Sequence, residues 1–253
     1  MLSNPLVSKL TSLTSLMSIS IKFTFLCGEF YHKKTKNEIW GESKLKMYRN
    51  LVFMAGEISK CEPPYEIAEE KFYQLKIPRK SGTIDVIYVK LADNLSAEIE
   101  DKELVILSGK ICSQNTSENK ENNHLIVYVQ AEEIQKVTDE EIEKILNNNF
   151  VQLEGYLCKK NHLRKTNSDC ILLDTLIAYN YENEGKRKSY YIPTIFWEEI
   201  ADKIDASYKI GEKITVEGRF QSRNYYKKNN EGEDKIFTTY EISVQNLGND
   251  DDD

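Results

Sequence analysis

The feature that most constrains the fold of this chain is a stretch of sequence that occurs twice. Residues 50–58 match residues 149–157: each stretch begins with Asn, alternates apolar and polar side chains, and then reaches Gly56 or Gly155. Alternation with period two predicts a half-buried β-strand, and the glycine predicts a bend in it. We therefore expect the chain to contain two similar β-rich units, each of which begins with one of these strands.

Further matches follow in the same order in both copies, which indicates a duplicated domain rather than a chance likeness. The aligned segments are 85–89 with 191–195, 104–111 with 213–220, and 125–129 with 240–244.

Each copy is expected to hold five strands. In the second copy they run roughly over 149–158, 170–181, 189–197, 213–223 and 236–246. Trp197, Ile200 and Ile204 share one face of a helix between the third and fourth strands. Strands and helix in this order describe an OB barrel. The predicted fold class is all-β: two tandem five-stranded OB-fold barrels, each with a short helix between strands three and four.

Repeat and composition together divide the chain into five parts. They are a leader or disordered extension over 1–46, a divergent first barrel over 47–134, a helical linker over 135–148, a second barrel over 149–247 and an acidic tail over 248–253. For the first part we favour a translated leader with the true start at Met47, and a targeting helix is the alternative. The linker helix is predicted from the capping-box spacing of Thr138 and Glu141.

Charge and cysteine usage exclude several classes of protein. The formal net charge is -7, but residues 50–134 carry -6 whereas residues 149–247 are neutral, so the second copy repels an anionic partner less. Five scattered cysteines without a C-x-x-C pair argue against a disulfide framework or zinc site, and favour a reducing cytoplasm. No apolar run has the length of a membrane span. We expect no metal, cofactor or membrane partner.

The fourth strand of the second copy carries the residue types that a single nucleic-acid strand needs. Arg219, Arg223 and Tyr225 fall on one face, and Lys227 and Lys228 follow. Cations neutralise phosphates, and a ring that stacks on an unpaired base contributes about 1–3 kcal/mol. A solvated amphipathic edge strand is the alternative interpretation.

Two other segments of the second copy point to the same place. The loop over 159–166 includes Lys160, Arg164 and Lys165 and no acidic residue, and the strand over 190–197 concentrates aromatic residues. On an OB barrel, the second and third strands and the first and last loops form the oligonucleotide groove. We therefore expect these segments to meet in one groove.

A set of motifs in the second copy carries a family resemblance. The motifs are Asn149-x-Val-x-Leu-x-Gly155, Arg164-Lys-Thr166, Tyr191-Ile-Pro193, Trp197 with Ala201, and Gly218-Arg-Phe-Gln-Ser-Arg-Asn-Tyr225. With them, residues 149–247 resemble the bacterial single-stranded DNA-binding protein family, in its Gram-positive form with two barrels per chain. Residues 50–134 are similar to the divergent first barrel of that form.

The resemblance implies a protein that is not an enzyme and that coats and protects single-stranded DNA, independently of sequence, in replication, recombination or repair. It implies a homodimer with four barrels and a nucleoid-associated place in the cytoplasm. It assigns DNA stacking to Tyr191, Trp197, Tyr225 and Tyr181, and phosphate binding to Arg164, Lys165, Arg219 and Arg223. The charge pattern adds Lys160, Lys227 and Lys228 to the phosphate-binding set.

This sequence departs from the family pattern in two places. Trp197 is followed by two glutamates where the family has Gly-Arg, which removes a cation. The tail over 248–253 is acidic but lacks closing hydrophobic residues, so a merely solvating end is as good an interpretation as recruitment of replication or repair proteins.

Two other functions were weighed. An OB-fold interaction or assembly module with little DNA affinity is the main alternative. A nuclease is disfavoured because the carboxylates are scattered, and Asp174, inside an apolar run, is expected to be a hydrogen-bonding residue at the barrel mouth.

The repeat alignment also predicts a division of labour between the copies. It sets Asp85, Leu91 and Thr116 of the first copy against Tyr191, Trp197 and Tyr225 of the second. Because all three rings are then missing from the first copy, we expect it to be a structural or dimerisation domain with little DNA affinity of its own.

Overall fold

The computed structural model describes residues 50–61, 71–96, 99–116, 124–143, 145, 147–166, 168–183, 186–228 and 234–248. All of them belong to one compact unit over residues 47–253. The predictions for 1–46 and for the acidic tail after Gly248 lie outside the described residues.

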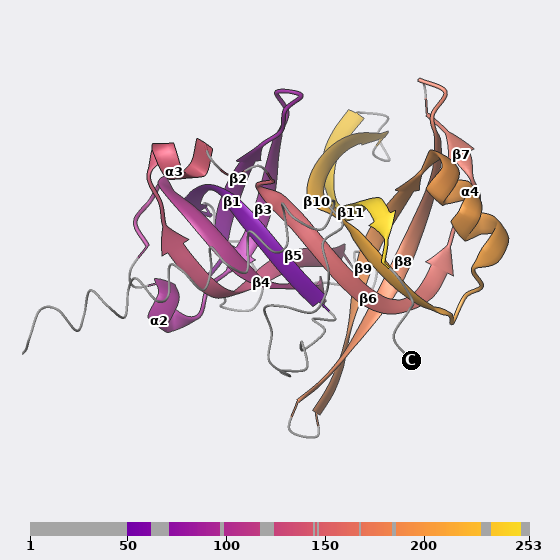
Figure 1. The fold of residues 1–253 in the computed structure, drawn as a ribbon, viewed down its shortest axis with the longest axis horizontal. Coiled ribbons are helices and arrows are strands. Elements are labelled where there is room, and N and C mark those ends of the chain that lie inside the picture. Colours follow the sequence, from indigo (N-terminus) through magenta and orange to yellow (C-terminus); the bar gives the residue numbers. More distant parts are fainter. Residues whose placement is uncertain are drawn as a thin grey trace, which may run out of the picture. The chain divides into compact units, whose positions relative to one another are not determined.

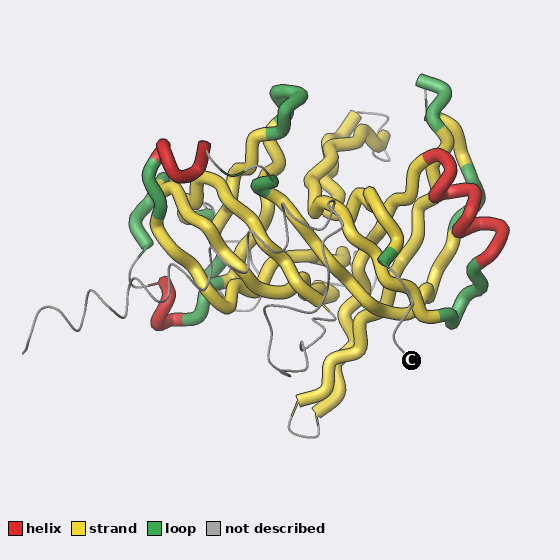
Figure 2. Tube along the Cα trace, in the orientation of Figure 1, coloured by secondary structure: helices red, strands yellow, loops and turns green. Residues whose placement is uncertain are grey.

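The described chain is mostly β, as the sequence predicts, with its strands in two regions (Figures 1 and 2). The first region contains β1 (Asn50–Lys60), β2 (Tyr73–Pro78), β3 (Ile84–Lys90), α2 (Asp93–Ser96), β4 (Glu103–Thr116) and β5 (His124–Lys136). The second contains β6 (Asn149–Lys160), β7 (Arg164–Lys165), β8 (Ile171–Asn183), β9 (Lys186–Trp197), α4 (Glu198–Ser207), β10 (Lys213–Lys228) and β11 (Asp234–Leu247). In the sequence, α3 (Asp139–Glu143) follows β5 and precedes β6, and it begins where Thr138 and Glu141 hydrogen-bond each other.

The second region closes into a five-stranded barrel. Its strands pair in the cycle β6–β8–β9–β11–β10–β6, and β9–β11 is the parallel pair among these described pairings. In the first region the pairings follow the same cycle, β1–β2–β3–β5–β4–β1, with β3–β5 parallel. In chain order, α2 lies between β3 and β4, and α4 lies between β9 and β10, so the two helices occupy equivalent places.

Equivalent β-bulges fix the correspondence of the two fourth strands. The ladder shifts at Gly109 in β4 and at Gly218 in β10, as the sequence alignment requires. A Cβ at either glycine would collide with a backbone carbonyl oxygen of the neighbouring strand, that of Gln130 or of Ser243. Glycine is therefore needed at both places because the backbones approach too closely for a side chain.

The third and fifth strands correspond differently from the sequence alignment. Val89 pairs with Val129, and Thr194 pairs with Ile242, so Val89 and Thr194 are equivalent. Tyr191 then corresponds to Val86, and not to Asp85 as predicted, and Trp197 corresponds to Ala92 and not to Leu91. In the fifth strand the predicted alignment is wrong by two residues.

The corrected register follows from burial. A shift of one residue moves every side chain of a strand to the opposite face. The side chain of Asp85 is fully buried, whereas Tyr191 is 41% exposed, so the two residues face opposite sides of their strands. In the sequence, the continuous apolar run over 86–89 has no glycine and does not define this register.

An asparagine clamp recurs at the start of each region. The Asn50 side chain donates to the carbonyl of Ile111 at 2.8 Å and accepts its N–H at 3.0 Å. Asn149 does the same with Phe220, at 2.7 and 3.0 Å. Both clamps are buried, where paired backbone groups avoid the cost of desolvation. The Asn that opens each repeat thus ties the first strand to the fourth.

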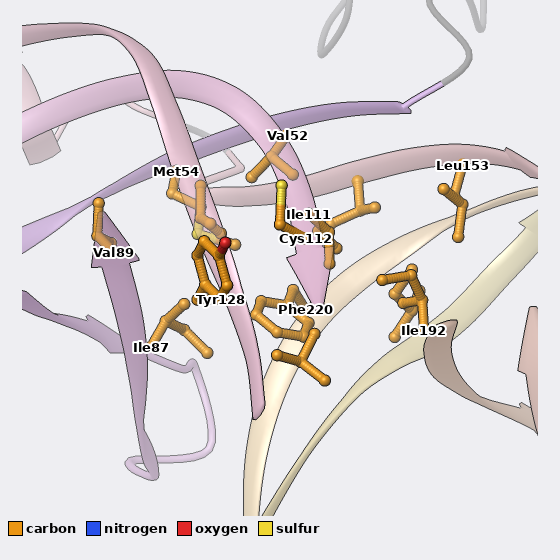
Figure 3. Close-up of a cluster of buried hydrophobic side chains, with 14 of the residues drawn as sticks. Val52, Met54, Ile87, Val89, Ile111, Cys112, Tyr128, Leu153, Ile192 and Phe220 are labelled. Atoms are coloured by element: carbon orange, nitrogen blue, oxygen red, sulfur yellow. The ribbon is translucent and has the colours of Figure 1, made fainter. Parts of the chain in front are cut away.

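The two regions share one hydrophobic core. Strands β1 and β6 pair antiparallel, with Val52 opposite Val151. Buried side chains of both regions, such as Ile111 and Phe220, belong to a single cluster (Figure 3). The two regions are therefore packed as one body.

Two equivalent serines also connect the regions. The hydroxyl of Ser113 accepts the N–H of Tyr191 at 2.7 Å, and the hydroxyl of Ser222 accepts the N–H of Val86 at 2.9 Å. Ser113 and Ser222 are equivalent in the fourth strands, as Val86 and Tyr191 are in the third. These bonds are what an approximate two-fold axis between the regions would produce.

Candidate nucleic-acid interface

A hollow of about 360 Å³ lies on the second region, where its strands bring distant parts of the sequence together. Arg164 from β7, and Arg223 and Tyr225 from β10, line it. The sequence analysis assigned all three to DNA binding, from two separate segments. The other lining residues come from β8, β9 and β11 and are Asp174, Thr175, Pro193, Thr194, Thr239 and Glu241.

One side of the hollow is formed by Arg164 and Asp174. The guanidinium donates from Nε and Nη2 to the two carboxylate oxygens, at 2.7 and 3.3 Å. Strand β7 places Arg164 opposite Leu172 of β8, and Asp174 lies two residues farther along β8. Asp174 is thus a hydrogen-bonding residue at the mouth of the barrel, and its partner is a predicted phosphate ligand.

A second paired arginine, Arg223, forms another wall. Its Nε and Nη2 donate to the carboxylate of Glu241 at 2.9 and 3.1 Å, and Gln221 donates to the same carboxylate at 3.0 Å. The hydrogen bonds that Arg223 donates to Glu241, together with the charge of Glu241, raise the pKa of Arg223, with a further contribution from Asp174. Glu241 is not recognisable from the sequence, because only the β10–β11 register, with Gln221 opposite Glu241, brings it beside the cations.

The predicted stacking rings differ in how they are held. Tyr225 and Tyr191 are 40% and 41% exposed, so a large part of each side chain can meet a ligand. Trp197, at the end of β9, is half-buried, and its Nε1 donates to the hydroxyl of Ser243 at 3.0 Å. This bond orients the indole. Tyr225 lines the hollow, whereas the other two rings lie outside its described lining.

Tyr181 and Arg219, both predicted to contact DNA, lie where the two regions meet. Lys110 of the first region places its Nζ 4.8 Å from the ring centroid of Tyr181. Arg219 lies beside Asp85, with 3.9 Å between its Nε and the carboxylate. Burial lowers the pKa of Arg219, as does the neighbouring Arg79, while Asp85 raises it. In this structure Tyr181 and Arg219 each interact with a residue of the first region.

Asp85 is the centre of that contact. Its carboxylate accepts hydrogen bonds from the Arg79 side chain and, at 3.0 Å, from the backbone N–H of Ser222 in the second region. Arg79 also donates to the carbonyl of Ser222, at 3.2 Å. The carboxylate that the sequence alignment placed on the DNA face is therefore buried between the regions.

The remaining predicted cations divide into two kinds. Lys160 donates to the carbonyls of Asp205 and Tyr208, where α4 ends, at 2.7 and 3.0 Å. Lys165 is exposed and pairs with Asp169 at 3.1 Å. The side chains of Lys227 and Lys228 lie outside the described residues.

Two other features are absent from the described part of the chain. No three His, Cys, Asp or Glu side chains gather there as a metal site requires. No helix in the same residues has the length and apolarity of a membrane span.

Comparison with known proteins places the second region in a family. Residues 148–249 match the single-strand binding protein family. A curated relative, single-stranded DNA-binding protein 1 of Streptococcus pyogenes, is 31% identical over 94 residues, which cover 36% of this chain and 70% of that protein.

Solved structures match over both regions. A deletion mutant of the single-stranded DNA binding protein from Thermus aquaticus has a TM-score of 0.56 at 17% identity, covering 81% of this chain and 95% of that one. The wild-type protein has a TM-score of 0.55 at 18% identity, covering 79% and 91%. At these identities the likeness establishes the fold.

Proposed function

The chain belongs to the single-strand binding protein family, and we propose that it binds single-stranded DNA through the hollow on its second β region. Membership makes it a binding protein and not an enzyme. The observation that carries the proposal is that Arg164, Arg223 and Tyr225 line one hollow. Two cations and a ring within one groove are what a phosphate backbone with unpaired bases requires.

The rings and cations would have separate tasks. Tyr225, Tyr191 and Trp197 accept bases, and Tyr181 extends the row toward the first region. Arg164 and Arg223 contact phosphates within the hollow, and the cations Lys160, Lys165, Arg219, Lys227 and Lys228 follow the strand around it. Stacking tolerates any base, so binding is independent of sequence.

At a finer level, both strand cycles are OB barrels that arose by duplication, over 47–134 and 149–247. Two such chains associate as a homodimer with four barrels. The protein acts on single strands during replication, recombination or repair in the cytoplasm. Light scattering with and without oligonucleotide tests the assembly, and a monomer at working concentration would contradict it.

Titration of the intact chain with labelled oligo-dT, and with a duplex of the same length, tests the function. We expect tight binding to the single strand, weak binding to the duplex, and loss of affinity as salt rises.

A second candidate is an assembly module with little DNA affinity. Its support is that Arg164 and Arg223 are already paired with carboxylates. Equal and weak binding of the single strand and the duplex would favour this candidate and contradict the first.

A further inference from the structure

Every predicted phosphate ligand with a described side chain already has a carboxylate within 4 Å. The pairs are Lys160–Asp205 at 3.5 Å, Arg164–Asp174 at 2.7 Å, Lys165–Asp169 at 3.1 Å, Arg219–Asp85 at 3.9 Å and Arg223–Glu241 at 2.9 Å. A phosphate that enters the hollow therefore meets Arg164 and Arg223 with a carboxylate already bound to each.

The two pairs in the hollow differ in burial. The side chain of Asp174 is 28% exposed, whereas that of Glu241 is 5% exposed and also accepts a bond from Gln221. Removing Arg223 from Glu241 would leave a buried carboxylate without its cation, which is strongly unfavourable. An exposed pair is weakly held, and water can solvate the carboxylate that is released.

We propose that Asp174 holds the place of a DNA phosphate on Arg164, and that binding exchanges this carboxylate for the phosphate. Arg223 keeps Glu241 throughout and contacts the strand from a fixed position. A guanidinium has five N–H donors, and the bonds to Glu241 use Nε and Nη2, so the pair leaves donors for phosphate. This inference rests on the proposed function and names the residue that limits its affinity.

The exchange has a consequence for the salt dependence of binding. A free cation that neutralises a phosphate on a single strand contributes about -0.7 to the slope of log K against log salt. In the exchange, Arg164 gains a phosphate but loses Asp174, which stays nearby as a negative charge. The pair therefore contributes less to the slope than a free arginine would.

The test is the variant Asp174→Asn in the intact chain, titrated with fluorescein-labelled oligo-dT over a series of NaCl concentrations. Asparagine keeps the size of the side chain and removes its charge. We expect about two- to fivefold tighter binding at low salt, the range set by the strength of exposed ion pairs. We also expect a slope steeper by up to about 0.7, the full contribution of a free cation.

A matched control is Glu57→Gln, which removes one negative charge from the exposed Lys76–Glu57 pair of the first region. It gives the variant the same net charge as Asp174→Asn, and we expect parent affinity and slope. Thermal melting of both variants verifies that they fold.

Arg164→Ala then separates exchange from general repulsion of DNA by Asp174. If Asp174 acts through Arg164, adding Asp174→Asn to Arg164→Ala changes neither affinity nor slope, as a double-mutant cycle would detect. Equal slopes for the parent and Asp174→Asn, or the same gain without Arg164, would overturn the exchange alone. No binding of oligo-dT by the parent would overturn the proposed function as well.

Discussion

The two β regions have the same buried framework and different outer faces. Both have an asparagine clamp, a glycine at a β-bulge and a serine that accepts an N–H from the other region. On the outer face, Tyr191 and Trp197 of the second region correspond to Val86 and Ala92 of the first. Buried polar groups need their partners, so they persist in both copies, whereas an outer face can change at little cost to folding.

The contact between the regions departs from this symmetry. At three equivalent positions the first region contributes Arg79, Asp85 and Lys110, and the second contributes Tyr181, Tyr190 and Arg219. One half of the contact is therefore an ion cluster, Arg79–Asp85–Arg219, and the other is Lys110 over the ring of Tyr181, with the buried Tyr190 beside Cys112. A duplicated scaffold can thus keep the place of a contact while replacing its chemistry.

The largest expected effect comes from removing the rings. Replacement of Tyr191, Trp197 and Tyr225 together by Ala should weaken binding of oligo-dT by about 3–9 kcal/mol, since each stacked base contributes about 1–3 kcal/mol. Val86→Ala at the equivalent position of the first region should leave affinity unchanged. Fluorescence anisotropy with labelled oligo-dT measures both variants.

A control for the ring prediction is Tyr156→Ala, because this tyrosine is 45% exposed on β6 and lies outside the described lining of the hollow. Its affinity should equal that of the parent. If Val86→Ala weakened binding as much as Tyr191→Ala, both regions would bind DNA and the division of labour would be wrong.

The next effect concerns the asymmetric contact. Asp85→Ala leaves Arg79 and Arg219 without their buried carboxylate, and should lower the free energy of unfolding by about 3–5 kcal/mol. At the equivalent position, Tyr190→Phe removes one hydroxyl and no charge, and should cost at most about 0.5–1.5 kcal/mol, the range for a single hydrogen bond. Urea denaturation followed by circular dichroism compares them, and equal losses would show that the ion cluster has no special weight.

The asparagine clamps should behave alike. Asn50→Ala and Asn149→Ala each leave a buried backbone N–H and C=O without partners, for an expected loss of about 1–3 kcal/mol in either region. Urea midpoints measure this. Different losses would mean that the two clamps contribute unequally to the stability of the shared core.

Sequence patterns predicted the buried framework of each region better than they predicted which residues lie on its outer face. The first and fourth strands aligned correctly because an Asn or a Gly with one structural task defines each. The third strand carries a continuous apolar run over 86–89, which fits two registers one residue apart, and so Asp85 was assigned to the wrong face. The pairing of Arg223 with Glu241 depends on which residues lie opposite each other in a hairpin, and composition does not encode this.

These tests use the intact chain for a structural reason. Separation of the regions would expose the paired edges of β1 and β6. Unpaired strand edges invite aggregation. Weak binding by a first-region fragment would then reflect a damaged fold as readily as a missing site.

The smallest expected effect distinguishes the two connecting serines. Ser113→Ala removes the acceptor of the Tyr191 N–H, and Ser222→Ala removes the acceptor of the Val86 N–H, so each should cost about 0.5–1.5 kcal/mol of stability. Their effects on DNA binding should differ. Tyr191 is a predicted stacking ring, whereas the backbone of Ser222 is still held by Asp85 and Arg79 after the hydroxyl is lost.

Oligo-dT affinity should therefore fall by up to about 1 kcal/mol for Ser113→Ala, less than the 1–3 kcal/mol of a stacked base, because the ring remains but its backbone is less restrained. For Ser222→Ala it should stay at the parent value. Anisotropy titrations at one salt concentration, on variants of equal melting temperature, measure the difference. If Ser222→Ala instead weakened binding more than Ser113→Ala, the contact with the first region would position β10, and not β9, for DNA binding.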